Sequence, residues 1–369
     1  MFASRLQGAV YRHCFKPIAF RFDAESVHDC LTKMGAWMGR HPSLRKTAGQ
    51  LWHYEHPALR QQVCGISFEN PVGLTAGFDK DGLLTDILPE VGFGFAEIGS
   101  VTGRPCSGNP RPRLWRLPHS RALLVYYGLK NEGCETVAHR LAQSRRRIPL
   151  GVSIARTNDQ IACTLEMGVE DYRHSFKTVE PVCDYLTVNI SCPNAFGGEP
   201  FTHPDRLDFL LRALDEIQTI KPVFLKMPAD LSLSEAEELA TVALTHRVHG
   251  FIFSNLTKRR DTPAISPRDS FASAKGGISG RPVFEPSNRL LKHFYRSYGA
   301  RFTLIGSGGV FSADDAYEKI CSGATLIQLA TGMIFEGPQV IGQINKGVVE
   351  RLERDGFTSV SQAVGAYLR

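Results

Sequence analysis

Eight short apolar segments that end in glycine or polar residues constrain the fold of this chain more than any other feature. They occur in the sequence from residue 70 onward and read "PVGLTAG", "FAEIGSV", "LGVSIAR", "YLTVNIS", "PVFLKMP", "GFIFSN", "TLIGSGG" and "LIQLATG". Longer stretches with helical spacing separate them. Buried strands that alternate with helices form a parallel sheet, and eight such units close into a barrel. The sequence therefore predicts an α/β fold, a (β/α)₈ TIM barrel with a small N-terminal helical extension.

The length and composition agree with one large domain and limit its partners. The chain has 369 residues, whereas a (β/α)₈ barrel needs roughly 250. A net charge of +6 is too small to indicate a nucleic-acid partner, although it is compatible with an anionic substrate or membrane surface. Nine cysteines without a CxxC pair or zinc spacing predict free thiols in a reducing compartment and no metal site.

The N-terminal segment, residues 1–60, is predicted to be helical, ahead of a barrel domain at 61–369. Asp23 is a candidate N-cap for one helix, and a second helix is expected from Pro42 to about Tyr54. The first 22 residues contain four basic residues and no acidic one. This pattern fits a transit peptide, an amphipathic segment that lies on a membrane, or the basic face of an ordinary helix. No apolar run approaches the ~20 residues that span a bilayer.

Polar groups at the carboxyl ends of the predicted strands are candidates for chemistry, because barrel enzymes place their active sites there. Lys80 follows the first strand and could hold an anion, although a tight turn also explains this segment. Asn189 and Asn194 flank Cys192 after the fourth strand. The two amides suit a carbonyl-rich heterocycle, and the thiol can act as a base or nucleophile. The alternative is a buried free cysteine between capping asparagines.

The fifth, seventh and eighth strand ends predict a bound anion. Lys226 stands in the apolar run "FLKMP", where an uncompensated charge is costly, so a partner anion is expected. The segments Gly306–Gly309 and Ala330–Gly332 resemble the two halves of the phosphate site that is common in barrels. Together the strand ends favour a phosphate-bearing cofactor across the barrel mouth, with a lysine and a thiol beside it.

The chain resembles the class 2, membrane-associated dihydroorotate dehydrogenases from about Tyr11 to the C-terminus. The resemblance rests on "FRFDAESVH", "NPVGLTAGFDKDG", "GFGFAEIGSVT", "GNPRPRLWRLP", "VNISCPN", "GGISGRP", "IGSGGV" and "SGATLIQLATGMIFEGP". In that class two N-terminal helices form a quinone entrance, which the resemblance assigns to residues 11–60. It implies oxidation of (S)-dihydroorotate to orotate in pyrimidine biosynthesis, with FMN as hydride acceptor and a membrane quinone as oxidant. It also implies peripheral attachment to the cytoplasmic side of the cell membrane.

The resemblance also implies roles for individual residues. Cys192 takes the place of the catalytic base, and Lys226 would stabilise negative charge on the reduced flavin. The positions that correspond to flavin contacts are Ala76, Gly77, Lys80, Ser100, Ser153, Asn189, Lys226, Ser254, Gly280, Gly309, Ala330 and Thr331. The positions that correspond to substrate contacts are Lys80, Asn189, Asn194 and Asn255.

Four positions depart from the family pattern. Cys192 stands where class 2 has serine, as in the soluble class 1 enzymes, and Ser153 replaces an asparagine near the flavin. Val125 and Leu256 stand where an asparagine and a threonine contact the substrate. Each lost hydrogen bond can cost ~1–3 kcal/mol. One alternative is therefore an FMN oxidoreductase of the same superfamily with a less polar substrate. Another is a barrel that binds a phosphate ligand without redox chemistry.

Overall fold

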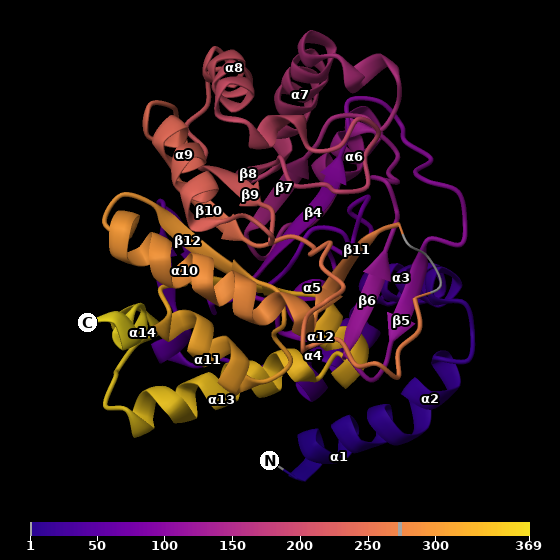
Figure 1. Cartoon of the computed structure of the whole chain (residues 1–369). Coiled ribbons are helices and arrows are strands. Elements are labelled where there is room, and N and C mark those ends of the chain that lie inside the picture. The colour runs from indigo at the N-terminus through magenta and orange to yellow at the C-terminus, as the bar shows by residue number, and fades with distance from the viewer. Residues whose placement is uncertain (1, 272–274) are drawn as a thin grey trace.

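The computed structural model describes residues 2–271 and 275–369 and contains the predicted parallel barrel. All eight predicted strands are present, and they close in the order β10-β12-β13-β3-β4-β7-β8-β9 (Figure 1). Every neighbouring pair in this order is parallel. The strands are β3 Val72–Leu74, β4 Phe95–Val101, β7 Leu150–Ile154, β8 Tyr185–Asn189, β9 Val223–Met227, β10 Gly250–Phe253, β12 Thr303–Ser307 and β13 Leu326–Leu329. The predicted fold class is confirmed.

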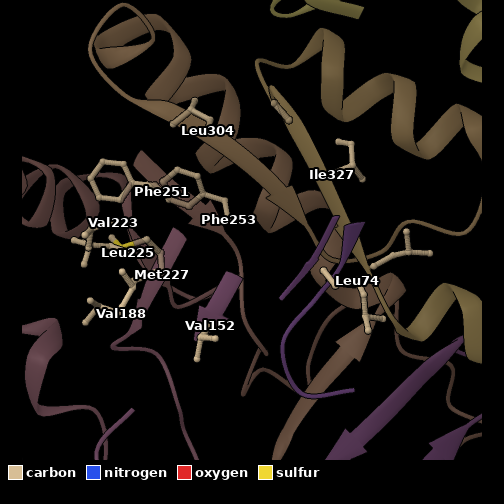
Figure 2. Close-up of a cluster of buried hydrophobic side chains, with 14 of the residues drawn as sticks. Leu74, Val152, Val188, Val223, Leu225, Met227, Phe251, Phe253, Leu304 and Ile327 are labelled. Atoms are coloured by element: carbon tan, nitrogen blue, oxygen red, sulfur yellow. The ribbon is translucent and has the colours of Figure 1, made fainter. Parts of the chain in front are cut away.

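Helices surround the barrel, and an apolar layer separates them from the strands. The helices from the first barrel strand onward are α5 Leu88–Val91, α6 Cys134–Ala142, α7 Leu165–Val179, α8 Pro204–Asp215, α9 Leu233–Leu244, α10 Phe284–Tyr298, α11 Ala313–Cys321, α12 Thr331–Glu336, α13 Val340–Arg354 and α14 Val360–Ala363. Figure 2 shows side chains of this layer, such as Val188, Leu225 and Phe253. Burial of such surfaces is the main stabilising term for a barrel of this size.

A second apolar cluster lies at the amino ends of the strands. The hairpin of β1 Gln61–Val63 and β2 Ile66–Phe68 contributes Val63 and Phe68, which pack with Phe95 and Tyr185 of the barrel. The barrel interior at this end is therefore filled by side chains. The carboxyl end is the one left for a ligand.

A three-stranded antiparallel sheet lies beside the barrel mouth. The predicted hairpin in the "RPCSGNPRPRLWRLP" region is β5 Leu114–Leu117 and β6 Ala122–Val125, and "GGISGRP" contributes β11 Gly277–Gly280 to the same sheet. Figure 1 shows this sheet next to the N-terminal helix α3, which contacts β5.

The N-terminal segment is helical, as predicted. Its helices are α1 Phe2–Val10, α2 Lys16–Ala19, α3 Ala24–Arg40 and α4 Pro42–Trp52, with a π-helical turn at Tyr11–Phe15. Asp23 caps α3 by accepting a hydrogen bond from the amide of Ser26, at 2.8 Å. The hydroxyl of Tyr11 donates to the carbonyl of Ile334, at 2.8 Å, so this segment packs on α12.

A buried ion-pair cluster joins α3 to the mouth sheet. Glu25 is almost fully buried, and its carboxylate accepts hydrogen bonds from Arg113 and Arg111, the shortest at 2.9 Å from each. Burial opposes ionisation, but the hydrogen bonds from Arg113 and Arg111 outweigh it and lower the pKa of Glu25. The "FRFDAESVH" motif therefore supplies both the helix cap and this anchor.

Candidate active site

An open cavity of about 920 Å³ occupies the carboxyl end of the barrel. Its lining comes from the ends of several strands and from the mouth sheet. The predicted site residues that line it are Ala76, Gly77, Lys80, Lys226, Ser254, Asn255, Gly280, Gly309, Ala330 and Thr331. The remaining predicted residues, Ser100, Ser153, Asn189, Cys192 and Asn194, are outside this lining. All of them except Cys192 are linked to it by the hydrogen bonds described below.

The expected anionic partner of Lys226 is Glu97, on the barrel strand β4. Their charged atoms lie 3.5 Å apart, and both side chains are buried. Lys226 also donates to the hydroxyl of Thr75, at 3.0 Å, while Glu97 accepts from Thr187 and Gln328, each at 2.9 Å. Sequence reasoning did not single out Glu97, because nothing in "FAEIGSV" indicates which face of the strand points toward Lys226. A compensated lysine is thus held at the cavity wall.

A chain of polar side chains connects the ends of four strands, β4, β7, β8 and β10. The hydroxyls of Ser100 and Ser153 lie 2.8 Å apart, and the amide of Asn189 donates to Ser100, also at 2.8 Å. The oxygen of Asn189 accepts from the hydroxyl of Ser191, at 2.7 Å, and Asn255 donates to that same hydroxyl, at 3.0 Å. These hydrogen bonds fix the orientations of the Asn189 and Asn255 side chains. The side-chain oxygen of Asn255 accepts no hydrogen bond from the other residues of this network.

The two departures from the family's substrate contacts both face the cavity. Val125 and Leu256 belong to its lining. The carbonyl of Val125 accepts a hydrogen bond from the side-chain amide of Asn194, at 2.9 Å. The side-chain amide of Asn194 therefore donates to a group of the protein itself. The cavity wall around Val125 and Leu256 is apolar.

Cys192 is half-buried just beyond the end of β8, and its surroundings disfavour the thiolate. Burial raises the pKa of Cys192 to about 11. The charge of Glu199 adds to this effect, and the charge of Arg156 opposes it. Arg156 donates to the carbonyls of Phe196 and Ala162, so it also restrains the loop that follows Cys192. Desolvation of the thiol outweighs the attraction of this guanidinium.

Lys80 reaches the N-terminal helix α3. Its ammonium lies 3.2 Å from Nε2 of His28 and 4.0 Å from the ring centroid of Tyr127. Burial and the charge of Lys130 lower the pKa of Lys80 to about 8. Burial and the charge of Lys80 lower the pKa of His28 to about 3, so His28 is neutral and can accept from Lys80. An anion bound in the cavity would raise the pKa of Lys80 again.

Three features of the cavity fit a flat ligand with a phosphate group. Gly77 has a φ of 104°, and a Cβ built on it would meet nothing within 4 Å, so its face is open to the cavity. The buried hydroxyl of Ser254 has no hydrogen-bond partner among the described residues. Gly309 has a φ of 73°, and a Cβ built on it would lie 2.5 Å from Cβ of Phe284, so only glycine allows the main chain to line the cavity here beside Thr331.

A second, apolar cavity of about 1370 Å³ adjoins the first. Leu31, Met34 and Met38 of α3 line it together with barrel residues, and Arg116 is the one charged side chain among its described lining residues. The two cavities share His28, Phe78, Leu114, Leu123 and Ile334. A ligand in either space would therefore contact the same wall.

Outside these cavities, one group of possible metal ligands comes together within the described ranges. Cys134, Glu135 and His174 place their ligand atoms within 4.8 Å of one another. The thiol of Cys134 donates to the carbonyl of Gly103, at 3.3 Å, and none of these residues lines a cavity described above. We assign no function to this group.

The fold and its lining residues define a (β/α)₈ barrel with a glycine-lined cavity at its mouth, and comparisons with known proteins specify the family. The model of the family "Dihydroorotate dehydrogenase" matches residues 58–352. A dihydroorotate dehydrogenase (quinone) of Roseiflexus castenholzii is 39% identical over 358 residues, which cover 96% of each chain. The protein of the same name from Acaryochloris marina is 36% identical and covers 96% of this chain and 99% of its own.

A solved structure agrees with these relatives. The crystal structure of DHODH from Eimeria tenella in complex with ferulenol has a TM-score of 0.84 and 28% identity, and the alignment covers 94% of this chain and 96% of that chain. The chain therefore belongs to the dihydroorotate dehydrogenase family, and the resemblance to the quinone-dependent class is confirmed.

Proposed function

We propose that this protein oxidises (S)-dihydroorotate to orotate in pyrimidine biosynthesis, with bound FMN as hydride acceptor and a membrane quinone as final oxidant. The observation that carries the proposal is that the barrel-mouth cavity, which contains Lys80, Lys226 and Asn255, adjoins an apolar cavity and shares five lining residues with it. Such a pair of spaces suits a polar substrate on one side of a flat cofactor and a hydrophobic oxidant on the other.

The residues that would hold FMN divide between its ring and its phosphate. Gly77 leaves room for the ring, and the unpartnered hydroxyl of Ser254 can donate to it. Lys226 supplies positive charge where negative charge develops. Gly309 and Thr331 would contact the phosphate. FMN, when bound, supplies the capacity to accept a hydride, and the protein orients the reactants and polarises them with its charged and polar groups.

The remaining polar groups would bind the substrate and move its proton. The side-chain NH₂ group of Asn255 already donates hydrogen bonds to Ser191. Its side-chain oxygen is therefore oriented to accept a hydrogen bond from a ring N–H of the substrate. Lys80 would pair with the substrate carboxylate. The thiolate of Cys192 would accept the proton from C5 while the hydride leaves from C6.

The decisive experiment is dihydroorotate-dependent bleaching of bound flavin under anaerobic conditions. We expect a yellow protein whose flavin absorbance falls on addition of dihydroorotate. The variant Gly309→Asp should lose flavin, because its Cβ would lie 2.5 Å from Cβ of Phe284 and would displace the loop that carries the proposed phosphate contact. An unaltered flavin content in this variant would remove the phosphate assignment, and a colourless natural protein would favour a barrel without redox chemistry.

A second candidate function is oxidation of a less polar substrate by the same cofactor. Val125 and Leu256 favour it, because both line the mouth cavity and neither offers a hydrogen bond from its side chain. If dihydroorotate is the substrate, Val125→Asn should tighten orotate binding or leave it unchanged. Failure of the natural protein to bind orotate at millimolar concentration, with flavin present, would favour this second candidate.

We also propose that residues 1–60 form the quinone entrance and contact the cytoplasmic side of the cell membrane as a peripheral protein. Within residues 2–271 and 275–369, none of the helices combines the length and apolar character needed to cross a bilayer. Several large apolar side chains in this segment are exposed: Leu6, Val10, Phe15, Ile18, Phe22, Met34, Trp37 and Leu51. Exposed apolar side chains beside an apolar cavity suit attachment to a lipid surface.

A pair of matched variants tests the entrance. Leu31→Arg places a charge in the apolar cavity, whereas Gln50→Arg places one on exposed polar surface of the same segment. We expect Leu31→Arg to suppress quinone reduction and to spare flavin reduction by dihydroorotate, with little effect of Gln50→Arg on either. Equal loss of both half-reactions in Leu31→Arg would point to a purely structural role for this segment.

A further inference from the structure

A buried lysine that the reaction does not use lies behind the glycine-rich loop at the mouth. Lys319 on α11 has an exposed fraction of 0%. Its ammonium donates to the hydroxyl of Ser287 and to the side-chain oxygen of Asn288, each at 2.8 Å. It also faces the ring of Phe284, 4.9 Å from the centroid. Two neutral oxygens and a ring therefore surround this amino group.

The structure gives this charge no adjacent counter-ion. Lys319 makes no salt bridge within 4.0 Å to any carboxylate among residues 2–271 and 275–369. Burial lowers the pKa of Lys319 to about 7, and Glu318 and Asp315 only partly oppose this effect. An isolated buried charge is costly, and a protein retains one where an anion compensates it.

The hydrogen bonds of Lys319 lead to the loop that lines the cavity. The hydroxyl of Ser287 lies 2.8 Å from the carbonyl of Ser307, to which it can donate. Ser307 lines the cavity together with Gly308 and Gly309. The aliphatic part of the Lys319 side chain packs against strand β12. A Cβ built on Gly306 of that strand would lie 3.1 Å from Cδ of Lys319.

We propose that Lys319 is a positioning residue for the phosphate of the flavin: its buried charge acts across the Ser307–Gly309 loop and favours a phosphate-bearing flavin over one without phosphate. This inference rests on the proposed function, because it assumes that a flavin binds at the mouth. The ammonium is buried behind the loop, out of contact with water, and the phosphate would lie on the cavity side of the same loop. Ser287 accepts a hydrogen bond from Lys319 and can donate to the carbonyl of Ser307, so it connects the lysine to the main chain of the loop.

The comparison of FMN with riboflavin separates this role from a merely structural one. The two ligands share the ring and the ribityl chain, and only FMN carries the phosphate. A charge that acts through a partly buried loop can change a binding constant by about tenfold. We expect Lys319→Met to weaken FMN by about tenfold and riboflavin by less than about twofold. A loosened fold would weaken both equally.

The experiment is a fluorescence titration of the flavin-free full-length protein with each ligand. Lys319→Arg, which keeps the charge, should retain more of the preference for FMN than Lys319→Met. The control variant is Lys346→Met, which removes a lysine that lies 3.8 Å from Glu350 on α13 and should leave both affinities unchanged. Thermal melting of each variant verifies that it folds.

A second variant keeps the test valid if Lys319→Met does not fold. Asn288→Asp retains the lysine and places a carboxylate at its hydrogen-bonded partner. This brings a negative charge closer to the ammonium than Glu318, the carboxylate to which the Asn288 amide donates at 3.1 Å. The variant should reduce the preference for FMN over riboflavin in the same direction. An unchanged preference in both Lys319→Met and Asn288→Asp, or equal weakening of both ligands, overturns the proposal. Absence of binding of either flavin to the natural protein would instead refute the proposed function.

Discussion

Removal of the charge on Lys226 should destabilise the protein strongly, because Glu97 would remain buried without its counter-ion. The two charged atoms are 3.5 Å apart and both side chains are less than 5% exposed. At an effective dielectric constant of about 20, two charges at this separation attract by about 5 kcal/mol. We therefore expect Lys226→Gln to lower the free energy of unfolding by about 3–5 kcal/mol, the range found when one partner of a buried pair is removed.

The double variant Glu97→Gln/Lys226→Gln should recover most of this loss. Neither position then carries a charge. The glutamine introduced in Glu97→Gln can still accept hydrogen bonds from Thr187 and Gln328, which bind the carboxylate in the natural protein. We expect the double variant to be more stable than Lys226→Gln by about 2 kcal/mol or more. It should not recover flavin reduction, because the positive charge beside the cofactor is still absent.

Urea unfolding followed by tryptophan fluorescence measures these free energies, and stopped-flow absorbance measures flavin reduction by dihydroorotate. Arg60→Gln is the matched control, because it breaks an exposed pair with Glu69 at 2.7 Å and should cost about 0–1 kcal/mol. A loss below about 1 kcal/mol in Lys226→Gln, no greater than the control, would refute the electrostatic reasoning. Recovery of flavin reduction in the double variant would refute the role of Lys226.

Three further predictions follow from other contacts. The rate of flavin reduction by dihydroorotate should rise about tenfold per pH unit from pH 6 to 9, because the pKa of Cys192, about 11, leaves only a small fraction of the thiol ionised to act as the base. A flat pH profile in stopped-flow experiments, or near-natural rates in Cys192→Ala, would contradict this role. Arg156→Met should accelerate limited proteolysis of residues 193–200, because it releases the carbonyl of Phe196; equal cleavage rates would argue against a restraint. Glu25→Gln should lower the Tm at pH 7 by weakening the contact with Arg113. The pKa of Glu25 is lowered on folding from its ordinary value of 4.5, so this difference should begin to shrink below that pH and disappear as the pH falls through the lower value of the folded protein; a difference that does not shrink with falling pH would contradict it.

The sequence by itself determined the barrel. Its strands are short apolar runs buried on both faces, and this pattern depends only on neighbouring residues, so all eight could be located from the chain alone. The same holds for α3, whose cap at Asp23 was predicted from local hydrogen-bonding chemistry. The polar strand ends could also be found, because the barrel fold brings every carboxyl end to one face.

The tertiary structure alone decided which of these groups act on one another. Glu97 compensates Lys226, and Lys319 lies behind the loop of Gly309, although nothing near either residue in the chain indicates its partner. Such pairs depend on which side chains face each other across strands and helices far apart in sequence. The direction of the pKa shift at Cys192 was likewise decided by burial, because the desolvation of a thiol depends on the whole environment that surrounds it and leaves no signature in the residues beside it.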